Sequence, residues 1–421
     1  MPPRCRRVYL PRWVSTKQIP LEFGGDESLR VTSVVPVSGV VRARRAVAIS
    51  FLVSGTGFAS FASRVPAVRD ALDLSSAQLG LLLLCLSGGS IMGLPLSGPI
   101  VQRFGPARTV LSASLAVTTG LVMLAAGLWL GLVRPAVVGF VLMGLGVGVW
   151  DVAMNVEGAD VERRLGRSLM PRLHAAFSLG TVAGAGLGAA SAAARVPLAV
   201  QVLFVAALMP VSIAIAVHYF LPGCFNAVQQ ALSGALAAWR EPRTLLIGLL
   251  VLGFAFMEGS ANDWLAVAMV DGYGTSEALG AIGFGLFVSA MTVGRLFGSA
   301  ALDRFRRVTV VRMSALTALI GLLLVLLSGS TVVALAGAAL WGLGTSLGFP
   351  IGMTAAADDP QSAAARVSVV SSIGYTAFLA GPPLIGLMAQ STGILRALFI
   401  VSGALALALL TSNASRPLRL R

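Results

Sequence analysis

The chain has 421 residues, of which 56% are apolar and only 11% are charged. A soluble protein of this size carries roughly twice that share of charged residues, so the composition excludes a water-soluble enzyme, a nucleic-acid-binding protein and a disordered scaffold. Lipid must be the solvent for most side chains. The net charge of +14 is almost entirely arginine, because Lys17 is the single lysine. The three cysteines form no CxxC pair, so we expect no disulfide, no metal site and no cofactor.

Twelve apolar runs of about 20 residues follow one another along the chain, each long enough to cross ~30 Å of hydrocarbon as a helix. Lipid leaves no partner for unpaired backbone groups, so every run is predicted to be helical. The runs start near Ala46, Ala77, Thr109, Pro135, Leu173, Leu198, Thr244, Ala278, Val310, Val332, Val367 and Leu395.

The arginines between the runs predict the orientation of the chain. If the segment before the first run is cytoplasmic, the large majority of the arginines fall in inner loops. The positive-inside rule then places both termini in the cytoplasm of a multi-pass cell-membrane protein. Residues 1–41 are basic and proline-rich with no apolar stretch behind them, so we expect a disordered cytoplasmic tail, or a start codon assigned too early, and not a secretory signal.

The first six runs resemble the last six. The matches keep their order at an offset of about 200 residues, which indicates an internal duplication. We therefore expect an all-α membrane protein of twelve transmembrane helices in two six-helix bundles, related by a pseudo-two-fold axis along the membrane normal. The matching pairs are Leu79-Gly80 with Leu279-Gly280, Arg103-Phe104 with Arg304-Phe305, Gly144-Leu145-Gly146 with Gly342-Leu343-Gly344, and Arg172 and Ser178 with Arg366 and Ser372. The expected parts are a tail at 1–41, a first bundle at 42–219, a cytoplasmic linker at 220–242, a second bundle at 243–412 and a cytoplasmic tail at 413–421.

Two loops carry a further pattern. The first loop contains Gly98, Gln102, Arg103, Gly105 and Arg108, and the second contains Asp303 and Arg304. Both resemble the G-x-x-x-D-R-x-G-R-R loop of the major facilitator superfamily, in which a small residue allows close helix packing and the charges latch neighbouring cytoplasmic helix ends. Gln102 stands where the family has aspartate. The resemblance implies the major facilitator fold and a secondary transporter. We expect the protein to be a monomer.

Shorter motifs are similar to the fucose permease branch of proton symporters within that superfamily. Asp151-Val-Ala-Met-Asn155 matches its acidic-x-A-x-N pattern in the fourth span, and Phe349-Pro350 fits the tenth. In the fifth span His174 and Phe177 fall on that branch's Gln and Asn positions. The resemblance implies that Asp151 is a proton-coupling group. Because the two amides that touch sugar in that branch are replaced here, it does not carry sugar over as the substrate.

Ionisable groups in the middle of a span are costly, at about 2.5–3.5 kcal/mol each, and need a reason. Asp151 shares a helix face with Asn155, four residues on, and is predicted to bind and release a proton, with a hydrogen bond to a neighbouring helix as the structural alternative. Glu258 and Asn262 repeat this spacing in the seventh span. Glu258 is a second candidate for proton or substrate binding, or else a salt-bridge partner. His174 is a third proton candidate, because histidine exchanges protons near neutral pH.

Other polar and aromatic side chains are candidates for the substrate cavity. With the residues above, this set comprises Asn155, Asn262, Phe177, Ser178, Tyr375, Trp150 and Trp341. Arg64 and Arg295 are expected to snorkel toward lipid headgroups. The alternative for Arg64 is that it reaches an acidic group from the outer vestibule. Glu157, Asp160 and Glu162 are expected to pair with Arg103 or Arg108 at the membrane surface.

The chain is thus predicted to be a secondary transporter and not an enzyme, with a small molecule and protons as its partners and no nucleic acid. It has no GxxxxGK[ST] motif for ATP, and two histidines with short loops offer little for catalysis. A drug or cation efflux transporter of the same fold is the alternative, followed by a non-transporting membrane sensor. Import and export stay open, as does the substrate.

Overall fold

The computed structural model describes residues 37–166, 169–221, 238–359 and 362–418. In this part of the chain the secondary structure is helical, with no strand. The helices of the first half are α1 (Val37–Ala62), α2 (Val65–Ala71), α3 (Ser76–Leu130), α4 (Val133–Leu165), α5 (Met170–Ala193) and α6 (Leu198–Val217). Those of the second half are α8 (Pro242–Val267), α9 (Glu277–Arg304), α10 (Arg307–Leu327), α11 (Thr331–Thr345), α12 (Gly348–Ala356), α13 (Ala363–Thr392), α14 (Ile394–Ala397) and α15 (Ile400–Thr411), with a π-helical turn at Ala268–Gly272 and a 3₁₀ turn at Ser412–Ser415.

Eleven helices of the described chain are long and apolar enough to cross a membrane, and α3 provides two crossings. Its 55 residues would extend ~82 Å as one straight helix, far more than a bilayer core. The helix bends at Gly105, where φ is +77° and ψ is 160°, a conformation open to glycine because it lacks a Cβ. Pro106 follows directly. The twelve predicted crossings are therefore present, and the protein is a multi-pass membrane protein.

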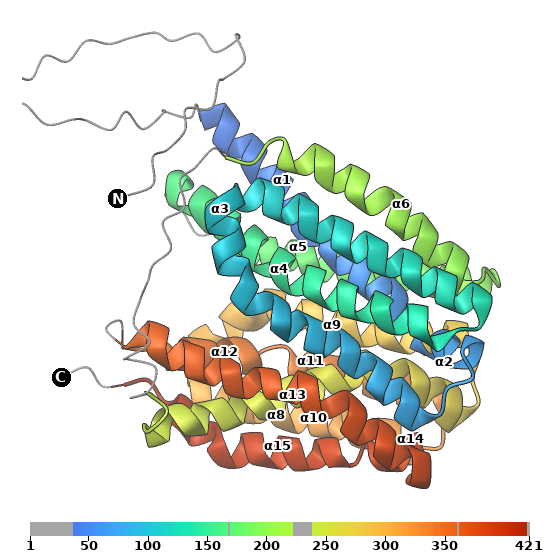
Figure 1. Cartoon of the computed structure of the whole chain (residues 1–421). Coiled ribbons are helices and arrows are strands. Elements are labelled where there is room, and N and C mark those ends of the chain that lie inside the picture. The colour runs from blue at the N-terminus through green and yellow to red at the C-terminus, as the bar shows by residue number, and fades with distance from the viewer. Residues whose placement is uncertain (1–36, 167–168, 222–237, 360–361, 419–421) are drawn as a thin grey trace, which may run out of the picture. The chain divides into compact units, whose positions relative to one another are not determined.

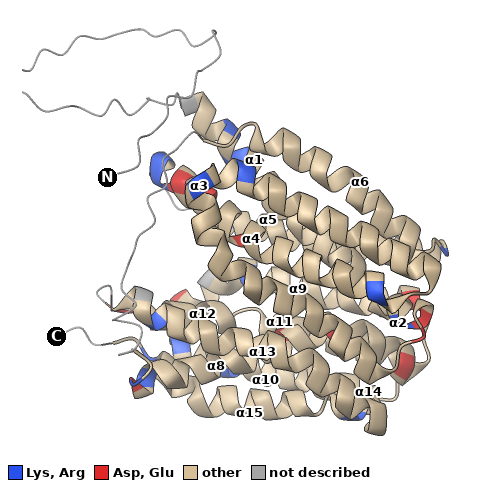
Figure 2. Ribbon diagram, in the orientation of Figure 1, with Lys and Arg blue, Asp and Glu red and all other residues tan. Residues whose placement is uncertain are grey.

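Helices α1–α6 pack into one bundle and α8–α15 into a second (Figure 1). The described chain begins and stops at the same end of the bundles, which we call the terminal end, and the opposite end, where α2 lies, is the far end. Charged residues gather near the two ends, while the long middle stretches carry few (Figure 2). This distribution is the one expected of helices whose middles lie in hydrocarbon.

Close glycine contacts show the duplication in three dimensions. Gly120 and Gly139 meet each other's backbones between α3 and α4, and Gly321 and Gly337 do the same between α10 and α11. A Cβ on Gly144 would meet the backbone of Leu86 on α3, and one on Gly342 would meet the backbone of Phe287 on α9. These small residues let backbones approach closely, which is how helices associate in lipid. The two bundles therefore use equivalent packing, as the repeat predicted.

The start of α1 differs from the expected boundary at residue 42. The helix begins at Val37, directly after Pro36, because Val40 and Ala43 are buried and extend its apolar face. The rest of the predicted tail and most of the predicted linker, residues 222–237, lie outside the described residues. α8 begins at Pro242, and a proline is well placed in the first turn of a helix.

The two bundles meet along two helix pairs, α3 with α13 and α5 with α9. α3 and α13 approach each other closely near the far end, where Gly80 packs on the backbone of Pro382 and Gly386 packs on the backbone of Ser76. In the other pair, a Cβ on Gly285 would lie 3.7 Å from the side chain of Ala185, again in the half nearer the far end. The bundles are thus in close contact toward the far end.

Candidate functional site

Asp151 lies near the middle of α4, and its carboxylate has one described hydrogen-bonding partner. Asn155 donates from Nδ2 to Oδ1 of Asp151 at 3.2 Å and to the Asp151 carbonyl at 2.8 Å. The pair forms because residues four apart lie on one helix face. The charge of Asp151 also acts on the phenol of Tyr375 on α13, in the other bundle. An acid of one bundle and a hydroxyl of the other are therefore within electrostatic reach at mid-helix, and the carboxylate has no described cationic partner.

Glu258 on α8 forms an ion pair with Arg295 on α9. Nη2 of Arg295 lies 3.1 Å from Oε1 and 3.3 Å from Oε2 of Glu258, with the side chains 29% and 17% exposed. The expectation that Arg295 snorkels is wrong, because the end of α9 is about 14 Å away along the helix and a carboxylate is nearer. Of the two readings of Glu258, the structure supports the salt bridge.

His174 lies near the start of α5, with an exposed side chain. Its ring meets the ring of Phe51 edge-on at 5.3 Å between centroids. The positive charge of Arg295 acts on it from the opposite bundle. His174 is thus within electrostatic reach of Arg295 of the other bundle, whose carboxylate partner is Glu258.

The other cavity candidates divide into two sets. Phe177, Asn262 and Tyr375 are half-buried and stay candidates. Trp150, Trp341 and Ser178 are 1%, 0% and 2% exposed. The prediction that they contact substrate is corrected, because their side chains are buried. Trp150 donates from Nε1 to Oγ of Ser50 at 2.9 Å, and Trp341 packs edge-on against Phe287. Both tryptophans fill the interior of their bundles, because the glycines beside them bring the neighbouring helices close.

The two copies of the loop motif lie at the terminal end, as predicted, but their side chains do not make the expected contacts. A Cβ on Gly98 would meet nothing within 4 Å, so this glycine does not mediate close packing. The useful glycine is Gly105, which makes the bend of α3. The side chains that the resemblance assigned to a charge latch, Gln102, Arg103, Arg108, Asp303 and Arg304, are exposed and make no ion pair with a described residue. Arg103 only stacks over the ring of Phe104.

Ion pairs at the terminal end are instead made by other residues. Asp358, after α12, accepts from Arg243 and from Arg307, both at 2.8 Å. Arg366 pairs with Glu241 at 2.6 Å and with Asp359 at 3.3 Å. The second bundle therefore has a charged network at this end.

The acids that follow Asp151 do not pair with Arg103 or Arg108, which corrects that expectation. Asp160 pairs with Arg163 and Arg164 of its own helix, because three- and four-residue spacings are the nearest on a helix surface. Glu162 accepts from the backbone amides of Leu169 and Met170 at the start of α5. Glu157 is fully buried and accepts from the amide of Leu221 at 2.6 Å.

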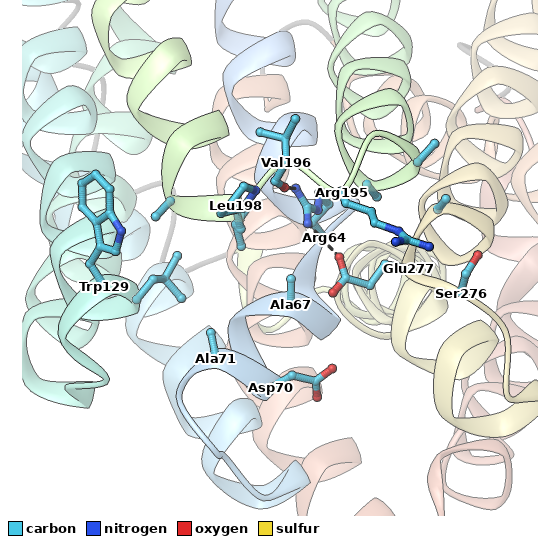
Figure 3. A pocket seen from close by; sticks show the side chains of 16 residues that line it. Arg64, Ala67, Asp70, Ala71, Trp129, Arg195, Val196, Leu198, Ser276 and Glu277 are labelled. Carbon is cyan, nitrogen blue, oxygen red and sulfur yellow. Dashed lines mark hydrogen bonds and ion pairs between the residues drawn. The ribbon is translucent and has the colours of Figure 1, made fainter.

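A latch at the far end joins the two bundles. Arg64, between α1 and α2, is 5% exposed and reaches Glu277 at the start of α9, with 2.8 Å between Nη2 and Oε2 (Figure 3). Its Nη1 donates to the Val196 carbonyl at 2.8 Å and to Oε1 of Gln201 at 3.0 Å. Arg64 was expected to snorkel, and this is wrong because the first bundle supplies two oxygens that hold it inward. The latch borders a cavity of about 710 Å³.

A second ion pair lies beside the first. Arg69 on α2 pairs with Asp271 of the π-helical turn and with its neighbour Asp70. These two carboxylates raise the pKa of the Arg69 guanidinium further, against the lowering effect of its partial burial. Among the described residues, the ion pairs between the bundles are those of Arg64 and Arg69, and both lie at the far end.

Sequence reasoning missed Gln201 and Glu277. A signal was present for Gln201, since it is the one amide in the otherwise apolar helix Leu198–Val217. It is 3% exposed and donates to the Ser60 carbonyl at 2.7 Å. Glu277 had no such signal, because an acidic residue in the first turn of a helix is commonplace.

Comparison with known proteins identifies relatives over most of the chain. A family model described as the Major Facilitator Superfamily matches residues 47–365 and 255–414. An uncharacterized MFS-type transporter of Yersinia pestis is 32% identical over 370 residues, which cover 87% of this chain and 93% of the relative. Among solved structures, the fold is similar to a variant of the nucleoside transporter NupG, with a TM-score of 0.73, and to the Escherichia coli fucose:proton symporter FucP, with a TM-score of 0.64. Each match covers 90% of this chain and 99% of the other at 14% identity, which shows the fold alone.

Proposed function

Because the chain belongs to the major facilitator superfamily and is a membrane transporter, we propose that it carries a small molecule together with protons by alternating access. In this proposal it works as a monomer in the cell membrane, with both termini in the cytoplasm. Asp151 is the proton-coupling group, and Asn155, Phe177, Asn262 and Tyr375 contribute to the substrate site.

The observation that carries the proposal is the environment of Asp151. A carboxylate at mid-helix in lipid is costly unless it is paired or protonated. Its described partner, Asn155, is neutral and donates one hydrogen bond to the Asp151 carboxylate and one to the Asp151 backbone carbonyl. A group in this position is stabilised by taking up a proton. Tyr375 of the opposite bundle lies within reach of its charge, so the protonation state of Asp151 is felt by both bundles.

The distribution of contacts supports alternating access. The two inter-bundle ion pairs of the described chain and the backbone contact of Gly80 with Pro382 between the bundles lie at the far end. With the terminal end in the cytoplasm, as the arginine distribution predicts, this arrangement corresponds to a state closed to the outside. Movement of one bundle against the other about a midplane site would then open the far end.

Efflux of a cation is the alternative function, and Glu258 does not support it. Glu258 is neutralised by Arg295, so it provides no unpaired charge for a cationic drug. Asp151 retains that ability when it is ionised. A substrate that competes with protons for Asp151 would leave in exchange for them, whereas a symported substrate would enter with them.

The test is proton flux in proteoliposomes that enclose a pH-sensitive dye. Uridine and L-fucose, chosen from the names of the structural neighbours, head a broader library that includes organic cations. We expect at least one compound to drive proton movement by the wild-type protein. Asp151→Asn should abolish the proton signal but keep exchange of labelled compound across the membrane, since the neutral residue imitates the protonated acid.

Asp73→Asn is the matched control, because Asp73 is exposed in the loop after α2, at a φ of +49° that asparagine also adopts. It should transport like the wild type. Proton-coupled transport that is unchanged in Asp151→Asn would remove the assignment of Asp151, and proton movement opposite to that of the compound would establish exchange in place of symport.

A further inference from the structure

A cavity of about 300 Å³ lies at the terminal end, between the stretch of α1 around Arg44 and the first turn of α5. It is lined by Arg44, Arg45, Ala48, Leu169, Arg172 and Leu173. Half of the described lining is therefore arginine, and none of these described residues is a carboxylate. The volume is in the range of small-ligand pockets.

Several arginines of the described chain at this end are neutralised by carboxylates. Arg243 and Arg307 share Asp358, and Arg366 pairs with Glu241. By contrast, Arg44, Arg45 and Arg172 make no hydrogen bond or ion pair with any described residue. Like charges around one cavity repel each other, and each guanidinium retains its full set of donors. The cavity is thus suited to an anion with several acceptor oxygens, and a phosphate group meets that description.

The position of the cavity points to the source of the phosphate. Arg44 is six residues into the span that starts at Ser38, or about 9 Å along the helix, and Arg172 is two residues into the span that starts at Met170. This depth is that of a headgroup layer. The rest of the lining is apolar, with Leu169 and Leu173 4% and 1% exposed. Basic groups above an apolar wall fit an amphiphile better than a fully hydrated ion.

We propose that this cavity binds the phosphate of an anionic phospholipid in the leaflet around the terminal end. Arg44, Arg45 and Arg172 hold the phosphate oxygens, and Ala48, Leu169 and Leu173 contact the glycerol and upper acyl region. The site lies directly beside the Phe51–His174 ring contact, since Phe51 follows Ala48 by one helical turn and His174 follows Leu173. A bound lipid therefore stabilises the packing of α1 on α5, and this holds whether or not Asp151 couples protons.

The test measures lipid binding to the purified full chain in a nonionic detergent by native mass spectrometry. Dioleoylphosphatidylglycerol is the anionic probe and dioleoylphosphatidylcholine the zwitterionic one. We expect selective retention of phosphatidylglycerol by the wild type. Replacing all three arginines by glutamine should weaken its binding ~100-fold, at about fivefold for each arginine near an anionic lipid. The single variant Arg45→Gln, at an exposed position, should show about one such step if the triple variant does not fold.

A triple variant with Arg108, Arg304 and Arg306 changed to glutamine is the matched control. It loses the same charge from exposed terminal-end positions outside the cavity and should keep the wild-type affinity. Equal binding of both lipids, or equal losses in the two triple variants, would overturn the proposal in favour of diffuse attraction. In a parallel arm, millimolar glycerol 3-phosphate should neither displace phosphatidylglycerol nor raise the melting temperature. If it does both, and the cavity variant abolishes the effect, the ligand is a soluble phosphate and the lipid assignment is wrong.

Discussion

Arg64 and Glu277 are 213 positions apart in the chain, yet their side chains meet at 2.8 Å and join the two bundles at the far end. The arginine is held from its own bundle by the Val196 carbonyl and by Gln201. Arg64 is therefore held in place by its own bundle, and the contact forms or breaks when Glu277 of the other bundle moves toward or away from it. Such a contact biases the equilibrium between two positions of the bundles.

Glu277→Gln should shift that equilibrium toward opening at the far end. The change removes the charge of one partner and leaves the buried guanidinium of Arg64 without its counterion, at a cost of about 1–3 kcal/mol. This corresponds to roughly a 5–150-fold change in the population ratio. Spin labels at Trp129 and Val332, which are 68% and 76% exposed, in a background without native cysteines, would report a longer inter-bundle distance. Glu277→Asp would test the charge with a shorter side chain, and unchanged distances in Glu277→Gln would rule out a latch.

The Glu258–Arg295 pair predicts strong coupling between two substitutions. Either Glu258→Gln or Arg295→Gln alone leaves one charge uncompensated among the helices, which we expect to lower the free energy of unfolding by about 2–4 kcal/mol. The double variant removes both charges and should recover most of that loss. Thermal melting of the four proteins measures the coupling. Strictly additive losses would mean that the ion pair contributes no coupling energy.

Two glycines of α5 provide a matched test of close packing. A Cβ on Gly180 would meet the backbone of Leu52 on α1, whereas one on Gly186 would meet nothing within 4 Å. Gly180→Ala should therefore lower stability by about 1–3 kcal/mol, because the helices must separate. Gly186→Ala should be neutral or slightly stabilising, since alanine favours the helix. Melting temperatures of the two variants check the difference, and equal effects would contradict the packing argument.

The lowered pKa of the Glu241 carboxyl predicts that the protein loses stability in acid. The hydrogen bond from Arg366 lowers the pKa of the Glu241 carboxyl below its ordinary value, and the Thr244 hydroxyl adds to the effect. A carboxyl with a lowered pKa in the folded state stabilises the protein above the unfolded value, which is about 4.3. The contribution is lost as pH falls through the lowered folded value.

Melting temperatures should therefore fall between pH 5 and pH 3, and Glu241→Gln should reduce that fall while costing stability at pH 7. Asp73→Asn, which changes an exposed acid elsewhere, should leave the acid loss as it is in the wild type. If Glu241→Gln keeps the full acid dependence, the Glu241–Arg366 ion pair is not its source.

The crossings and the duplication could be predicted from the sequence because both depend on local physics. A run of apolar residues has to be helical in lipid wherever the rest of the chain lies. Glycines such as Gly144 and Gly342 mark equivalent surfaces by spacing alone. The Asp151–Asn155 contact was equally local, since it depends only on the helical repeat.

The partners of the charged residues were decided by the tertiary structure. Nothing near Arg64 in the chain indicates Gln201 or Glu277, and Arg295 finds Glu258 on another helix. The reason is physical: in lipid a charge bonds to whichever group its helix faces, and helix facing is set by the packing of the whole bundle. Trp150 and Trp341 are interior for the same reason. The chain alone therefore determined which segments cross the membrane, and only their packing decided which charges are paired and which, like Asp151, have no described cationic partner.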